Sequence, residues 1–140
     1  IRYGEVILNL AEAAVELSTY GVNDYLAVAQ VAFDLLRSIH GGLPAKTMDL
    51  EVVRHERRID LMYEGFRYWD LRRWRLAGEV IDGKQAHGTK ITKKDDNSYT
   101  YEQVSCDDNI NRFFPERYYL LPIPVDELQN NPLCENNAPW

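Results

Sequence analysis

Residues 52–74, VVRHERRIDLMYEGFRYWDLRRW, decide the fold of this chain. Read with the period of an α-helix, they place an apolar stripe on one face. The stripe consists of Val52, His55, Ile59, Met62, Tyr63, Phe66 and Trp69. A neighbouring flank carries charges of alternating sign, namely Arg57, Asp60, Glu64 and Arg67. Because these charges are three or four residues apart, each can reach the next along the helix surface. The stretch therefore predicts a scaffold helix with a structural ion network.

The path of the chain at Gly65 decides the environment of Asp70 and Arg73. If the helix runs straight, both side chains point among the apolar groups, where they are best interpreted as a mutually neutralising pair. If Gly65 bends or ends the helix, both are exposed. In either case the two residues extend the structural ion network, and neither is expected to be catalytic.

Two helices are predicted before this stretch, over residues 2–18 and 24–40, and alanines on both predict an αα-hairpin. The inward stripe expected on the first helix is Tyr3, Ile7, Leu10, Ala11, Ala14 and Leu17. Thr47 or Asp49 can cap the third helix, and a last helical piece is expected from Phe66 to Ala77, closed by Gly78. Residues 1–78 thus predict a scaffold of tetratricopeptide-like helix pairs.

Residues 79–140 are rich in proline and polar residues and predict an irregular wrap packed on the helices. Residues 88–93 and 98–104 can pair as a small β-hairpin, and residues 118–123 are expected to be extended. The tail is expected to be anchored by Trp140. The fold class predicted for the whole chain is mainly α.

Composition narrows the class of protein further. The chain has 140 residues, of which 45% are hydrophobic, so one modest globular domain is expected. A net charge of −6 with mixed signs disfavours nucleic-acid binding, and no apolar run is long enough to span a membrane. Because the sequence opens inside a helical pattern and without a signal peptide, we expect a fragment of a longer protein.

The two cysteines, Cys106 and Cys134, are far apart in sequence and belong to no metal-binding motif. A disulfide is possible in an exported protein, but two separate thiols are expected. His55-Glu56 resembles the start of a zinc-protease motif, which then fails because position 59 is Ile59 rather than histidine. No metal site and no cofactor is predicted.

The acids Glu56, Asp60 and Glu64 lie on one helix face, and a glycosidase pair, which needs two carboxyl groups flanking the substrate, is one interpretation of them. Each of them has an arginine within one helical turn, which lowers a carboxyl pKa and does not suit a general acid. We therefore interpret all three as structural, and no catalytic residue is predicted.

Aromatic side chains are the remaining candidates for binding. Tyr99 and Tyr101, close to several polar residues of a surface loop, are candidate carbohydrate-binding residues, although two tyrosines on one face are also typical of a solvated strand. By their helical positions, Trp69 and Trp74 are expected to be core or helix-packing residues.

Several of these segments carry a resemblance to a known family. Residues 56–61 and 64–74 resemble the central signature of the SusD/RagB family. Residues 1–13 are similar to its upstream helix, and residues 119–124 with Asn131-Pro132 are similar to its closing segment. Three matches in the family's order are spread over nearly the whole chain, which makes the resemblance specific.

The resemblance implies a non-catalytic protein on the surface of the outer membrane of a Gram-negative bacterium. Such a protein binds oligosaccharide and delivers it to a SusC-like TonB-dependent transporter, and a lipid anchor outside this fragment attaches it to the membrane. The family's glycan-contacting residues lie largely in segments that this chain lacks, so none is assigned here.

Two other functions are compatible with the sequence. A helical-repeat module for protein–protein interaction would bind no sugar and would need an exposed groove lined by the helix stripes. A glycoside hydrolase fragment would need two acids facing an open cleft.

Overall fold

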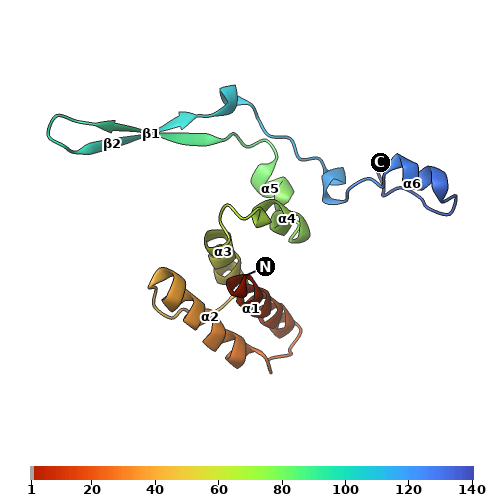
Figure 1. The fold of residues 1–140 in the computed structure, drawn as a ribbon, viewed down its shortest axis with the longest axis horizontal. Coiled ribbons are helices and arrows are strands. Elements are labelled where there is room, and N and C mark those ends of the chain that lie inside the picture. The colour runs from red at the N-terminus through yellow and green to blue at the C-terminus, as the bar shows by residue number, and fades with distance from the viewer. Residues whose placement is uncertain (1) are drawn as a thin grey trace. The chain divides into compact units, whose positions relative to one another are not determined.

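The computed structural model describes residues 2–140, and Ile1, with which the upstream family-like segment begins, lies outside them. Within the described residues, six α-helices and one two-stranded antiparallel sheet follow one another along the chain (Figure 1). The mainly α fold with a small hairpin is therefore as the sequence predicts. The chain divides into two compact units, residues 1–67 and residues 68–140.

The first unit is built from three helices, α1 (Tyr3–Thr19), α2 (Leu26–Gly41) and α3 (Leu50–Asp60). The predicted αα-hairpin is confirmed, because α1 and α2 pack against each other, and α3 packs on α1. Gly21 makes the connecting turn with a φ of +84°, a value that favours glycine. The Asp49 carboxylate caps α3 by accepting a hydrogen bond from the Val52 amide at 2.7 Å. The core consists of Ile7, Leu8, Ala11, Val15, Phe33, Leu36, Val53 and Leu61.

The buried face of α1 differs from the predicted stripe. Leu8 and Val15 are buried, whereas Leu10 and Leu17 are each more than a third exposed and Tyr3 is largely exposed. The reason is that α1 packs against two helices, so its buried face is set by the positions of both α2 and α3. A stripe predicted for a helix with one neighbouring helix therefore lies on a different face of α1 from the one that is buried.

The stretch that decides the fold is two helices rather than one. After α3 the chain turns through residues 61–65, and α4 (Phe66–Arg73) begins directly afterwards. Tyr63 and Gly65 adopt φ values of +67° and +81°, which end the helical path. The single apolar stripe is therefore wrong, and Ile59, Met62, Tyr63 and Trp69 are all at least half exposed. Of the two paths considered at Gly65, the one that ends the helix is correct, but the exposure expected with it is wrong for Asp70, which is buried and pairs with Arg73.

The last predicted helical piece also divides. α4 ends at Arg73, and α5 (Ala77–Ile81) follows a turn in which Arg75 has a φ of +58°. Gly78 lies inside α5 and does not close the helix, contrary to prediction. Its amide donates a hydrogen bond to the Tyr119 hydroxyl at 2.8 Å. A Cβ atom at this position would lie 3.3 Å from that oxygen, so Gly78 leaves room for the tyrosine.

The predicted hairpin is confirmed with ends that shift by one residue. It consists of β1 (His87–Lys93) and β2 (Tyr99–Ser105), paired antiparallel with Ile91 opposite Tyr101. The Asp96 carboxylate accepts hydrogen bonds from the amide and the hydroxyl of Ser98, which fixes the connecting turn.

The C-terminal part is held by its own aromatic contacts. After a 3₁₀ turn at Asp107–Asn109, a second one at Glu116–Tyr119 makes the prediction of an extended run wrong for its first two residues. The short helix α6 (Val125–Asn130) follows. Trp140 stacks on Tyr118 with ring centroids 5.9 Å apart and donates a hydrogen bond to the Leu120 carbonyl at 2.9 Å. The predicted anchoring of the tail by Trp140 is therefore confirmed.

The boundary between the compact units falls after residue 67, ahead of the boundary at residue 78 that the sequence suggested. The packing of residues 79–140 on the helices stays a prediction. Cys106 and Cys134 carry free thiols, as expected. Across residues 2–140, no helix combines the length and apolar character that crossing a membrane requires.

Candidate functional site

The candidate site is a cleft of about 510 Å³ in the second unit. Its size falls in the range of clefts that bind small ligands. It is lined by Trp69, Arg72, Arg73, Arg75, Tyr119, Leu120, Leu121 and Asn137. The lining thus combines aromatic rings, apolar side chains and three guanidinium groups.

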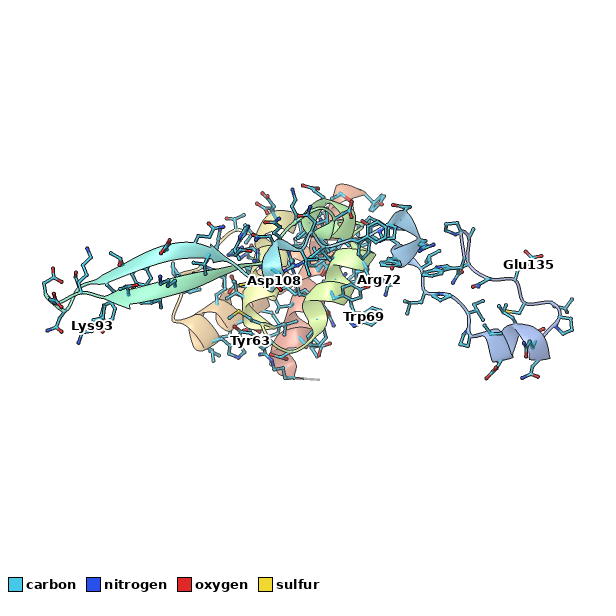
Figure 2. The ribbon with its side chains drawn as sticks, turned by 90° about the horizontal axis from the view of Figure 1, so that it is seen from above. Tyr63, Trp69, Arg72, Lys93, Asp108 and Glu135 are labelled. Carbon is cyan, nitrogen blue, oxygen red and sulfur yellow. The ribbon has the colours of Figure 1, made fainter. Side chains whose placement is uncertain are left out.

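One wall of the cleft is the surface of α4. Leu71 packs with Ala77 and Phe114 in the core of the second unit, which fixes the rotation of the helix. On its other side, Trp69 and Arg72 are three residues apart and therefore adjacent on the helix surface. The Arg72 guanidinium lies over the Trp69 ring, with its central carbon 4.9 Å from the ring centroid. Both residues are labelled on α4 in Figure 2. Trp69 is 54% exposed, so the prediction that it packs in the core is wrong.

The other wall comes from the segments near Tyr119 and Asn137. The Tyr119 ring packs against Phe114 with centroids 5.0 Å apart, and its hydroxyl accepts the hydrogen bond from Gly78. The Asn137 side-chain amide donates to the Leu121 carbonyl at 2.6 Å. Because each of these groups is held by its own contacts, the wall is formed without a ligand.

The cleft is cationic. Arg72 is only 7% exposed, and its one hydrogen bond among the described residues is from Nη2 to the Tyr119 carbonyl at 2.9 Å. Its buried Nε and Nη1 atoms have no hydrogen-bond partner. The Arg73 Nε atom donates to the buried Asp70 carboxylate at 2.9 Å. At the rim, Arg75 and Glu116 are exposed and 3.6 Å apart, a separation typical of a weak surface pair.

The lining offers binding chemistry. Among the described residues of the cleft there is no carboxylate, imidazole or thiol that could transfer a proton or attack a substrate. Arginine and tryptophan instead bind through charge, hydrogen bonds and ring faces. One sequence signal points to this site, the spacing of Trp69, Arg72 and Arg73 on one helix face. From the sequence alone, Trp69 is assigned to packing and Arg73 to the ion network instead.

Two acids of the predicted ion network, Asp60 and Glu64, have a partner outside the predicted set, whereas Arg73 pairs with Asp70 within it. Asp60 and Glu64 both bind Arg2, whose Nη2 and Nε atoms lie 2.8 Å from the respective carboxylates, and His40 Nδ1 lies 2.8 Å from Asp60. Burial alone would lower the pKa of Arg2, but the hydrogen bond with Glu64 and the charge of Asp60 raise it. Arg2 is remote in sequence, and no local spacing could have revealed it.

The charges of α3 mainly join helices to one another. Arg57 donates to the side chain of Asn9 on α1 at 2.8 Å and lies over the Phe66 ring. The buried Glu56 forms an ion pair with Arg37 on α2. Through these contacts, charged residues of α3 connect it to α1 and α2.

The tyrosines predicted to bind carbohydrate lie on the hairpin, apart from the residues that line the cleft. Tyr99 and Tyr101 point to one face of β2, opposite Lys93 and Ile91, and are 53% and 70% exposed. They form a small open aromatic surface. Their role in binding sugar stays a prediction.

Comparison with known proteins identifies the family. The SusD family model matches residues 1–140, and the chain belongs to this family. A SusD-like protein from Bacteroides fragilis has a similar solved structure, with 28% identity and a TM-score of 0.75 over the whole of this chain and 25% of that one. The solved structure of BT4246 is similar in fold, with 23% identity and a TM-score of 0.74 over the whole of this chain and 23% of that one. No curated protein matches the chain.

The chain thus spans about a quarter of the length of these solved relatives. The resemblance drawn from residues 56–61 and 64–74 is confirmed by the family match. The relatives also support the fold class, since the described helices and the small sheet all fall within the similar region.

Proposed function

We propose that this chain is part of a non-catalytic protein that binds oligosaccharide during nutrient uptake at the cell surface. The family match over residues 1–140 carries the proposal, because SusD-like membership is associated with glycan binding in nutrient uptake. The cleft at α4 is consistent with it, since its aromatic and guanidinium groups suit binding and its described lining lacks a proton-transfer pair.

Calorimetric titration of the full-length protein with a panel of neutral and acidic oligosaccharides tests the binding step. We expect saturable binding of at least one glycan class, with an affinity that depends on the sugar and its linkage. The absence of binding to every member of a broad panel would contradict the proposal.

We further propose that the full-length protein acts at the outer membrane, attached by a lipid anchor, and passes its glycan to a SusC-like TonB-dependent transporter. Membership of the SusD family supports this step. Affinity purification of the tagged full-length protein from solubilised outer membranes, with identification of the co-purified proteins by mass spectrometry, tests it. A TonB-dependent transporter in stoichiometric amount is the expected result, and recovery of the protein from the cytoplasm without one would contradict it.

The second candidate is a helical-repeat module for protein–protein interaction, and one surface favours it. The outer face of α2 is an apolar stripe with a helical period, formed by Val28, Val31, Leu35 and Ile39, all more than half exposed. Such a stripe is typical of a surface that another helix covers. This function predicts that Val31→Asp abolishes complex formation and leaves glycan binding unchanged, whereas a glycan-binding role alone predicts no partner for this face.

A further inference from the structure

We propose that the cleft at α4 recognises the carboxylate of an acidic sugar, so that the glycan bound by this protein contains uronic acid residues. This inference rests on the proposed glycan-binding function and names the substrate class of the cleft. It is carried by the juxtaposition of Arg72, Arg73 and Arg75 with the exposed ring of Trp69.

The positive charge of the cleft is not balanced by acids in its described lining. Arg72 is almost fully buried, and no carboxylate among the described residues pairs with it. Two nitrogens of this buried guanidinium, Nε and Nη1, lack acceptors among the described residues, which is costly. The rings of Tyr68 and Trp69 compensate for only part of that cost. An anion brought into the cleft would supply the missing countercharge.

The other two arginines, Arg73 and Arg75, also line the cleft. Arg73 pairs with the buried Asp70, and 46% of its side chain stays exposed where it lines the cleft. Arg75 is 60% exposed, lies over the Tyr119 ring at 4.7 Å, and forms an exposed ion pair with Glu116 at 3.6 Å. Both can therefore approach a ligand from the rim.

The lining of the cleft suits a carboxylate carried by a sugar ring. Planar guanidinium groups match the geometry of a carboxylate, which they bind through paired hydrogen bonds. The exposed Trp69 ring and the apolar side chains of Leu120 and Leu121 add a surface for the C–H faces of a sugar ring. A small free carboxylate would use the charge and leave this apolar surface empty.

The experiment is calorimetric titration of the full-length protein at a fixed ionic strength of about 0.15 M, because screening changes the strength of charge pairs. The probes are trigalacturonate and its fully methyl-esterified form, which have the same sugar and linkage but differ in charge. We expect trigalacturonate to bind at least about tenfold more tightly, the factor that one charge-assisted hydrogen bond provides. Equal affinity for the two would overturn the inference.

Two variants localise the preference. Arg75→Gln removes a rim charge whose ion pair is weak, so the fold is preserved and the preference for trigalacturonate over its ester falls by about tenfold. Trp69→Ala, at an exposed position, weakens the binding of both probes. Arg58→Gln is the matched control, because it makes the same charge change on an exposed position of α3 and leaves the preference intact.

Three further outcomes are informative. A preference that Arg75→Gln and Arg58→Gln reduce equally would overturn the inference, because the net charge rather than the cleft would be the cause. Competition by sodium acetate at the same concentration as trigalacturonate would also overturn it, since the site would then accept any small carboxylate. Tight binding of neutral glycans without an acid preference would overturn this inference and leave the proposed glycan-binding function standing.

Discussion

Leu8 and Leu10 on α1 provide the sharpest test of the packing in the first unit. The helical stripe expected from the sequence buries Leu10, whereas the structure buries Leu8 completely and leaves Leu10 38% exposed. The same substitution, leucine to alanine, can be made at both positions of one helix. The two free energies of unfolding therefore distinguish the two faces directly.

The magnitudes follow from burial. Leu8→Ala removes three buried carbon atoms, a transfer loss of about 2.4 kcal/mol, and the cavity left among Ile7, Phe33 and Val53 raises the total to about 3–5 kcal/mol. At Leu10 only the covered part of the side chain is lost and solvent fills the space, so about 1.5 kcal/mol is expected. Leu35→Ala on the exposed face of α2 is a further control with about 1 kcal/mol.

Urea unfolding of the full-length protein and its variants gives these differences, and amide hydrogen exchange in α1 shows whether the loss is local to the first unit. We expect Leu8→Ala to be the more destabilising substitution by at least about 1.5 kcal/mol. A cost for Leu10→Ala equal to or above that for Leu8→Ala would refute the packing described here.

Three further predictions concern single side chains. Asp49→Ala removes the N-cap of α3 and is expected to cost about 1 kcal/mol in urea unfolding, whereas no change would show that the cap is not used. Asp70→Ala is expected to lower the free energy of unfolding by about 1–3 kcal/mol. The loss is limited because the half-exposed Arg73 side chain can turn to water when its partner is removed. A loss below about 0.5 kcal/mol would show that Asp70 is solvated. Hydrogen bonds from the Ser98 side chain and then its amide lower the pKa of Asp96, so the turn is stabilised above the unfolded-state pKa and loses this support as the pH falls through the lowered value. An NMR titration of the Asp96 carboxyl checks the direction, and a raised pKa would contradict it.

Local patterns predicted the elements well, because their causes are local. The hairpin follows from alternation and polar turn residues, with Asp96 and Asn97 at its turn. The capping of α3 by Asp49 follows from a side chain only three residues from the amide that it binds. Such features depend on the adjacent sequence alone and are visible without a fold.

Contacts that join distant segments were missed for the opposite reason. The buried face of α1 depends on two neighbouring helices, which the period of one helix cannot reveal. Arg2 reaches Asp60 and Glu64 from the other end of the first unit, and His40 joins them from α2. Charges spaced along one helix suggested a self-contained network instead.

The cleft was missed because three separate segments build it. Trp69 and Arg72 come from α4, Tyr119 from the second 3₁₀ turn and Asn137 from the tail. In the sequence, Trp69 falls on the apolar stripe of a continuous helix and is therefore predicted to be buried. It is exposed because the helix breaks between α3 and α4, where Gly65 lies. Binding residues contributed by a loop and a tail carry no periodic signal.

Binding without chemical change is the central claim, and one measurement tests it most directly. The full-length protein is equilibrated by dialysis against a fluorescently labelled oligosaccharide that it binds, and the retained sugar is then sized by chromatography. We predict that the protein retains the oligosaccharide and that the sugar is recovered at its original length. Shorter products, formed in proportion to the amount of protein, would contradict it.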